Sequence, residues 1–250
     1  MRGRVLVDCF PAAVPRYGPP WTIVAVDVIR ATTTIVTALS QGRRCFPVAT
    51  LDEALEVMAR LDDPLVAGEL GGSTPYGFEM TNSPAHLARR TDVGRPLVLL
   101  STSGTQLICG AHPDQPVYAA SLRNLAATVG HVAQQGGDVA IIGAGARGSF
   151  RREDQLGCAW IARGLAAAGY RPQGGTEELI RRYRDAPVDV IATGASARYL
   201  EETGQRGDLE FILEHVDDVD GVFCRSGEEM VDARRPPSRA LSADDRREEG

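Results

Sequence analysis

An aspartate, an arginine and three threonines stand close together in one short stretch of the chain: Asp27, Arg30, Thr32, Thr33 and Thr34. The preceding residues 22–26 (TIVAV) are apolar and mostly β-branched, which is typical of a buried strand in a parallel sheet. Open α/β sheets bind ligands at the carboxyl ends of their strands, and a helix start attracts anions. We therefore interpret Asp27 as a cation ligand, and Arg30 with the threonines as an anion-binding site. The alternative is an ordinary turn capped by Asp or Thr.

A second group of polar residues follows another predicted strand, at residues 96–100 (PLVLL). The strand opens directly into a serine, threonine and glycine turn that contains Ser103, Gly104 and Thr105. Backbone amides and hydroxyls in such a turn point toward one place and suit a small anion. A capped turn without a ligand is the alternative.

The third group lies in a long stretch rich in Gly, Pro, Ser and Asn, at residues 68–87. Irregular segments of this length are uncommon in compact domains unless they are functional. Glu69 and Glu79 are candidate metal ligands, and Asn82 is a candidate substrate contact. The alternative for each carboxylate is a solvent-exposed position on the loop.

The fourth group combines bases and acids at the start of a predicted helix over residues 153–168. Arg147, Arg151 or Arg152 is the candidate partner for a carboxylate or sulfonate, while Glu153 and Asp154 are candidate catalytic acids or metal ligands. Acids at a helix start can also serve only to complement the helix dipole.

The same region contains GAGARG, from Gly143 to Gly148, which matches a dinucleotide fingerprint. An NAD(P)-binding oxidoreductase is therefore an alternative. We disfavour it because the helix starts only near residue 153 and no ribose-binding acid follows at the usual distance.

For a phosphate-ester substrate, the very slow uncatalysed hydrolysis favours a metal ion in the site. A helix terminus contributes typically ~0.3–1 kcal/mol to holding an anion, whereas phosphate monoesters hydrolyse extremely slowly without a catalyst. Mg²⁺ on Asp27 and further acids, with Arg30 and the two turns on the phosphate oxygens, would supply the missing stabilisation. The metal candidates are Asp27, Glu69 and Glu79, and the catalytic candidates are Asp27, Arg30, Glu69, Glu153 and Asp154. We favour attack by water over a covalent intermediate on Asp27.

Composition excludes several classes of protein. All 27 basic residues are arginines, so no lysine is available for a Schiff base or a Walker motif. The net charge of −6 argues against a nucleic-acid or anionic-membrane surface. No apolar run is long enough to span a membrane, and the start lacks the apolar core of a signal peptide. The five cysteines are widely separated, which fits a reducing compartment and hence the cytoplasm.

Strand and helix patterns alternate up to about residue 168, which predicts an α/β protein with a three-layer α/β/α architecture and a mainly parallel sheet. We expect one domain over residues 1–233, with two α/β lobes as an open alternative. Residues 234–250 are charged and poor in apolar side chains, which predicts a disordered tail. The sequence leaves open whether the chain forms a homo-oligomer.

Taken together, VDVIRATTTIVTAL, GE-x-GG with GFEMTNSP, STSGT, SLRNLAA and GAGARGSFRREDQLGCAWIA resemble the 2-phosphosulfolactate phosphatase (ComB) family. The likeness covers roughly residues 5–165 and continues more weakly to about residue 225. It implies an α/β/α fold and a Mg²⁺-dependent phosphatase that converts 2-phospho-3-sulfolactate to 3-sulfolactate, a step toward coenzyme M.

Two positions depart from the family pattern. Ser103 stands where the family has Asn, and Glu79 stands where it has Asp. Both changes bear on the substrate, which we expect to be a small phosphorylated acid, more than on the reaction class. A relative that binds phosphate ligands without turnover is the remaining alternative.

Overall fold

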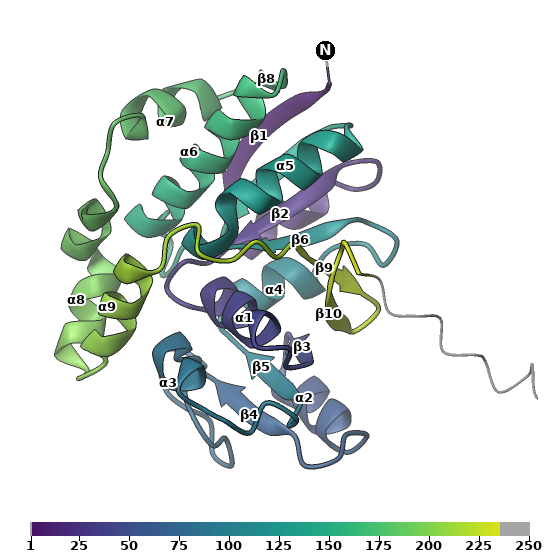
Figure 1. The fold of residues 1–250 in the computed structure, drawn as a ribbon, viewed down its shortest axis with the longest axis vertical. Coiled ribbons are helices and arrows are strands. Elements are labelled where there is room, and N and C mark those ends of the chain that lie inside the picture. Colours follow the sequence, from purple (N-terminus) through teal and green to yellow (C-terminus); the bar gives the residue numbers. More distant parts are fainter. Residues whose placement is uncertain (1, 236–250) are drawn as a thin grey trace, which may run out of the picture.

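The structure, a computed structural model, describes residues 2–235. These residues form a ten-stranded sheet in the order β4-β5-β3-β10-β9-β6-β2-β7-β1-β8 (Figure 1). The strands are β1 (Arg4–Cys9), β2 (Thr22–Val26), β3 (Cys45–Val48), β4 (Leu65–Gly68), β5 (Leu97–Leu100), β6 (Val117–Ala120), β7 (Val139–Gly143), β8 (Arg171–Pro172), β9 (Phe223–Ser226) and β10 (Glu229–Asp232).

Helices flank the sheet on both faces (Figure 1). They are α1 (Ala31–Ser40), α2 (Leu51–Met58), α3 (Pro84–Ala88), α4 (Gly104–Cys109), α5 (Leu125–Gln135), α6 (Arg152–Ala167), α7 (Thr176–Tyr183), α8 (Ala195–Glu202) and α9 (Arg206–Glu214), with 3-10 helices η1 (Pro11–Arg16), η2 (Leu122–Asn124) and η3 (Val188–Thr193).

Alternation along the central strands fixes the layers. In β2, Val24 and Val26 pack in one apolar core with residues of α5 and α6, while Ile23 and Ala25 pack in a second core with residues of α1 and α4. Successive side chains of a strand point to opposite faces, so a fully apolar strand needs helices on both sides. The predicted three-layer α/β/α architecture is confirmed.

Two parallel sets of strands make up the sheet, and the hairpin of β9 and β10 joins them. Six of the nine pairings are parallel, and the three antiparallel ones all involve β9 or β10. Three reversals lie between β6 and β3, so the two parallel sets run in opposite senses. Sheet twist of about 20–25° per strand accumulates over the five steps from β2 to β5 to roughly 100–125°. This rotation allows the carboxyl ends of both sets to approach one place.

The helix predicted over residues 153–168 is confirmed as α6, and the strands predicted at residues 22–26 and 96–100 are confirmed as β2 and β5. Sequence reasoning missed α3, β8 and β10. The five-residue α3 had a local signal, because Ser83 caps it by accepting from the His86 amide and Pro84 begins it. The two strands had none: β8 has two residues, and β10 joins β3 by a single residue pair, Met230 and Cys45.

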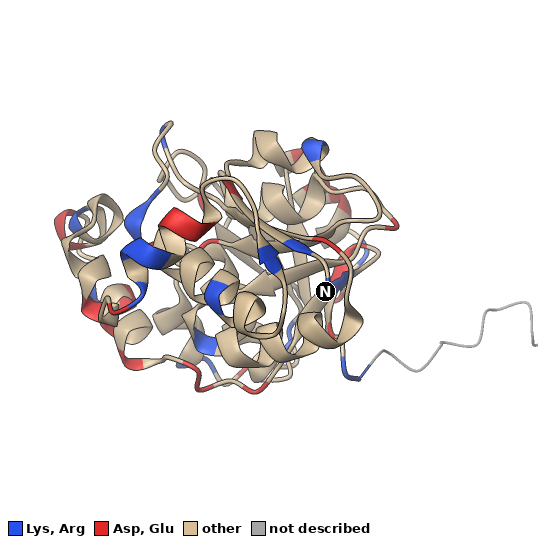
Figure 2. Ribbon diagram, turned by 90° about the horizontal axis from the view of Figure 1, so that it is seen from above, with Lys and Arg blue, Asp and Glu red and all other residues tan. Residues whose placement is uncertain are grey.

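The tail predicted for residues 234–250 lies outside the described residues, except for its first two. Across residues 2–235, none of the helices combines the length and the apolar character that a membrane crossing requires. Acidic and basic positions are interspersed around the molecule when it is viewed from above (Figure 2).

Candidate active site

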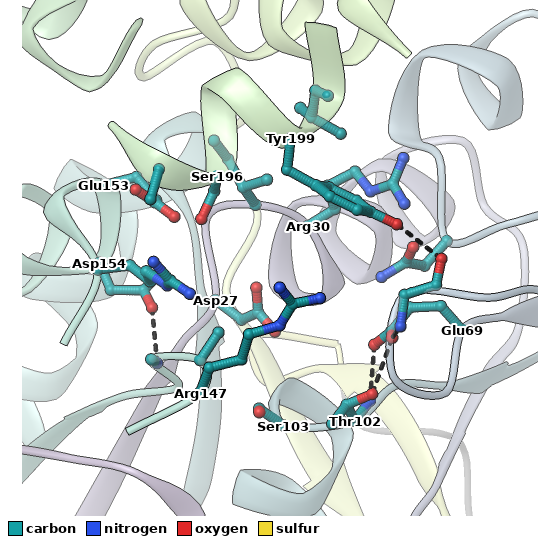
Figure 3. Close-up of a pocket in the computed structure, with 18 of the residues that line it drawn as sticks. Asp27, Arg30, Glu69, Thr102, Ser103, Arg147, Glu153, Asp154, Ser196 and Tyr199 are labelled. Carbon is teal, nitrogen blue, oxygen red and sulfur yellow. Dashed lines mark hydrogen bonds between the residues drawn. The ribbon is translucent and has the colours of Figure 1, made fainter. Parts of the chain in front are cut away.

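A cavity of about 390 Å³ lies where loops from both parallel sets of strands meet. Its lining includes nine of the residues predicted from sequence: Asp27, Arg30, Glu69, Asn82, Ser103, Arg147, Arg151, Glu153 and Asp154. These residues come from five separate parts of the chain, namely the ends of β2, β4, β5 and β7 with the start of α6, and the loop before α3. Figure 3 shows the Asp27 and Arg147 side chains pointing into the space that this ring of residues encloses.

Asp27 lies at the floor of the cavity and is only 7% exposed. Burial raises the pKa of its carboxyl group to about 7, and the negative charges of Glu69 and Glu153 act in the same direction. The Ala31 amide and the Arg30 guanidinium oppose this rise only in part. The site therefore holds negative charge that its own groups do not neutralise, which suits a cation.

The two acids at the start of α6 are held differently. Asp154 accepts from the Val28 amide at 3.0 Å and from the Gly145 amide at 2.9 Å, so it ties the ends of β2 and β7 together. Glu153 is 1% exposed, and its Oε2 atom has no hydrogen-bond partner among residues 2–235. Burial raises the pKa of both carboxyl groups. Asp154 thus has a clear positioning contact, while Glu153 keeps an oxygen free for a ligand.

Glu69 fixes the glycine-rich loop that closes one side of the cavity. Its carboxylate accepts from the Thr102 amide at 2.7 Å, from the Thr102 hydroxyl at 2.8 Å and from the Gly72 amide at 2.8 Å. These three bonds join the loop after β4 to the turn after β5. The carboxylate therefore orders both loops in addition to facing the cavity.

Arg30 is buried beside the cavity and is paired within the protein. Its Nη1 atom donates to Asp208 at 2.6 Å and to Gln205 at 2.5 Å, both from the α9 region. Arg147 and Arg151 also line the cavity, and neither has a carboxylate partner within 4.0 Å among residues 2–235. Arg198 also lines the cavity without a carboxylate partner in the described part of the chain, so the guanidinium groups available for an anionic substrate are those of Arg147, Arg151 and Arg198 rather than that of Arg30.

The structure does not bring all the predicted residues to the cavity. The three threonine hydroxyls of α1 donate instead to backbone carbonyls: Thr32 to Asp27, Thr33 to Val28, and Thr34 to Arg30 and Asn82. All three are 1% exposed or less. Short polar side chains at a helix start satisfy local backbone groups, which is the capped-turn alternative considered above. The threonines therefore shape the turn that carries Asp27 and Arg30.

Thr105 and Glu79 also lie away from the cavity. Thr105 exchanges hydrogen bonds with Ser101 inside the turn after β5. The Glu79 carboxylate accepts from Arg95 at 2.6 Å and 3.0 Å, on the outer side of its loop. Arg95 holds the pKa of Glu79 below its ordinary value. The predicted metal set of Asp27, Glu69 and Glu79 is therefore not assembled, because a closer cation already neutralises Glu79.

Gly104 contributes by having no side chain. A Cβ atom at this position would lie 2.2 Å from Oδ2 of Asp27 and 2.5 Å from Cβ of Ala31. The start of α4 can therefore pack directly against the carboxylate only because residue 104 is glycine.

We predict that Gly104→Ala forces Asp27 out of place. Overpacking of this kind costs about 1–3 kcal/mol of unfolding free energy, and a displacement of about 1 Å at a reacting group costs on the order of 10²-fold in rate. Urea denaturation and steady-state kinetics measure the two effects. Gly130→Ala is the control, because nothing lies within 4 Å of a Cβ at residue 130 in α5. Equal effects of the two substitutions would contradict the role of Gly104.

Sequence reasoning missed the wall that α8 supplies. Ser196, Arg198 and Tyr199 line the cavity, and the Tyr199 hydroxyl donates to the Gly72 carbonyl at 2.7 Å, across to the glycine-rich loop (Figure 3). The α8 sequence is a short amphipathic helix with no motif that indicates a site. Only the packing of α8 beside α9 and η3 brings these residues over the strand ends.

The GAGARG segment does not form a dinucleotide site of the expected kind. Gly143 ends β7, and α6 begins only at Arg152. Ala146 and Ser149 bond to each other within the intervening loop, and the Gly145 amide is occupied by Asp154. The amides that would bind a pyrophosphate at a helix start are therefore not presented.

The donor atoms of the lining residues show whether the cavity can bind a divalent cation. Asp27 and Glu153 are carboxylates that face the cavity, and Glu153 has an unpartnered buried oxygen. No group of three His, Cys, Asp or Glu residues within the described part of the chain is already arranged as a metal centre. Mg²⁺ characteristically takes only one or two carboxylates, with water and substrate oxygens completing its shell. The residues present therefore fit Mg²⁺ bound together with substrate.

The raised pKa of Asp27 predicts how stability depends on pH without metal. The folded state binds the Asp27 proton more tightly than the unfolded state, so the unfolding free energy falls as pH rises from about 4 toward 7. We expect Asp27→Asn to gain stability relative to the native chain across this window, on the order of a few kcal/mol. Urea denaturation at pH 5 and pH 8 in metal-free buffer measures the difference. If the difference in unfolding free energy between the two proteins were the same at pH 5 and pH 8, the raised pKa of Asp27 would be contradicted.

Comparison with known proteins identifies the family to which the chain belongs. The family model described as 2-phosphosulpholactate phosphatase matches residues 9–223. A Thermotoga maritima protein named "Probable 2-phosphosulfolactate phosphatase" is 33% identical over 192 residues, covering 76% of this chain and 83% of that protein. A Symbiobacterium thermophilum protein of the same name is 35% identical over 199 residues, covering 75% and 84%. The chain therefore belongs to the 2-phosphosulpholactate phosphatase family, whose members are phosphoric monoester hydrolases.

Proposed function

We propose that the protein is a Mg²⁺-dependent phosphatase that converts 2-phospho-3-sulfolactate to 3-sulfolactate and phosphate. The observation that carries the proposal is one cavity in which buried carboxylates, led by Asp27, face the guanidinium groups of Arg147 and Arg151, which form no ion pair within residues 2–235. A small acid that carries a carboxylate, a sulfonate and a phosphate group needs several cationic contacts, and a phosphate ester needs a cation at its reacting oxygens.

The chain's own residues divide the work as follows. Asp27, with Glu153 facing the same space, would hold the Mg²⁺, which supplies Lewis-acid stabilisation of the phosphoryl oxygens. Arg147 and Arg151 bind the remaining anionic oxygens, and bidentate contacts from them fix the orientation of the substrate. Ser103 offers a hydroxyl from the turn after β5. Tyr199 and Glu69 hold the glycine-rich loop in place at the side of the cavity.

A water molecule is the proposed nucleophile. Asp27 packs against the start of α4 and borders the α1 turn, so its carboxylate is fixed in position as a ligand should be. Asp154, whose two oxygens each accept a backbone amide, positions the loops rather than the water.

The test is phosphate release from purified protein with and without Mg²⁺. The substrates are 2-phospho-3-sulfolactate and 2-phospholactate, which differ only in the sulfonate. We expect no turnover in EDTA. We expect kcat/KM for 2-phospho-3-sulfolactate to be at least about 10-fold higher than for 2-phospholactate, since one charge-assisted contact contributes roughly that factor. Binding of the esters without released phosphate would support a non-catalytic relative. Equal rates for both acids would refute the proposed substrate.

Mg²⁺ binding has a readout of its own. We expect Mg²⁺ to raise the thermal midpoint of the native chain at pH 8, because a ligand of the folded state stabilises it. The same addition should leave the midpoint of Asp27→Asn unchanged. An equal rise in both proteins would remove Asp27 from the metal site.

A further inference from the structure

A second cavity, of about 490 Å³, lies beside the first, between the start of α6, the end of α7 and the start of α8. Four arginines line it: Arg151, Arg152, Arg182 and Arg198. The remaining lining residues are neutral, so this cavity contains no carboxylate of its own. We call it the arginine cavity.

None of the four guanidinium groups forms an ion pair within residues 2–235, although the charges of Arg151 and Arg152 act on the neighbouring Glu153 and oppose the rise of its pKa. Among residues 2–235, no carboxylate lies within 4.0 Å of any of the four, whereas Arg181, which neighbours Arg182 on α7, pairs with Glu178. Arg152 donates to the neutral Thr193 hydroxyl, and Arg198 donates to the Thr193 carbonyl at 3.1 Å. The buried Nε atom of Arg151 has no hydrogen-bond partner in the part of the chain that the structure describes.

This concentration of unpaired cations is unexpected in a chain of net charge −6 with 33 acidic residues. Mutual repulsion of like charges in one hollow costs free energy unless an anion enters. Guanidinium groups bind phosphate and sulfonate oxygens through charge-assisted, bidentate hydrogen bonds. The lining therefore has the chemistry of a receptor for a small tetrahedral oxyanion.

We propose that the arginine cavity binds a second small dianion, of the phosphate or sulfonate class, separately from the substrate. Arg151 and Arg198 line both cavities, so anions on the two sides compete for the same donors. Occupation of the arginine cavity therefore weakens anion binding at the candidate active site. The anion is either free phosphate or a second sulfonated acid, since both carry the oxygens that this lining recognises.

Calorimetric titration of metal-free protein with inorganic phosphate tests the site directly. The variant is Arg152→Gln with Arg182→Gln, because these two residues line only the arginine cavity. We expect it to bind one phosphate fewer than the native chain, and Arg182→Gln alone to bind this phosphate about 10-fold more weakly. Arg181→Gln, the neighbouring position on α7 that is already paired, is the matched control and should bind as the native chain does.

Equal stoichiometry in the native chain and the double variant would overturn the proposal. Titration with 3-sulfolactate in place of phosphate tells the two sources apart, since the true ligand binds more tightly. The proposal would also be overturned if Arg182→Gln raised the KM for substrate while all phosphate sites were kept. The arginine cavity would then be part of the substrate site. The phosphate titration needs no turnover, so it stands apart from failure of the proposed hydrolysis. Circular dichroism checks that the single variant, whose altered side chain is exposed, remains folded.

Discussion

Asp27→Asn abolishes Mg²⁺-dependent phosphate release, with an expected loss of about 10³-fold or more. The substitution keeps the shape of the side chain and removes the charge that would hold the cation. Because burial and the charges of Glu69 and Glu153 already disfavour the ionised form, the neutral amide relieves repulsion in the folded state. We therefore expect the thermal midpoint in metal-free buffer at pH 8 to rise. Activity would then be lost without loss of fold.

Glu79→Gln is the matched control for this experiment. It also replaces a carboxylate by its amide, but Glu79 pairs with Arg95 outside the cavity. The pair is partly exposed, so its loss should cost at most about 1 kcal/mol and leave kcat within a few-fold of the native value. Comparable losses of activity in the two variants would show that the cavity around Asp27 is not where hydrolysis takes place. Full activity of Asp27→Asn would lead to the same conclusion.

Sequence reasoning located the floor of the site because local patterns specify it. Residues 22–26 form an apolar strand whose pattern can be recognised on its own, and its end places Asp27 at the edge where α/β sheets bind ligands. The same logic placed Ser103 after β5, and Glu153 and Asp154 at the start of α6. What each strand end contributes is therefore largely a local property of the chain.

The partners of these residues are not local. The arginine at position 30 was predicted to bind a substrate anion. Its guanidinium instead pairs with Asp208, 178 positions later in the chain. The Glu79 carboxylate was predicted to bind a metal ion, but it forms an ion pair with Arg95 outside the cavity. The opposite senses of the two parallel sets depend on a hairpin that contacts β3 through one residue pair. Contacts between residues far apart in the chain depend on tertiary packing, and the sequence carries no periodic pattern that predicts them.

Asp208→Ala is expected to destabilise the protein by about 3–5 kcal/mol, the typical cost of leaving one member of a buried ion pair alone. Asp208 is 3% exposed and accepts from Nη1 of Arg30 at 2.6 Å, from the Ser83 hydroxyl at 2.5 Å and from the Ala85 amide at 3.1 Å. A single carboxylate on α9 thus joins the α1 turn to the loop that precedes α3. Its removal leaves the buried Arg30 guanidinium with only Gln205 as a side-chain acceptor.

Urea denaturation compares this variant with Glu210→Ala, which lies on the same helix in an exposed pair with Arg206. The control should lose no more than about 0.5 kcal/mol, because exposed pairs one helical turn apart contribute little. Asp208→Asn should fall between the two, since it keeps an acceptor for Ser83 and Ala85 while losing the charge that Arg30 requires. A loss below about 1 kcal/mol in Asp208→Ala would mean that Arg30 readily finds another anion or water, and that α9 does not hold the floor of the site together.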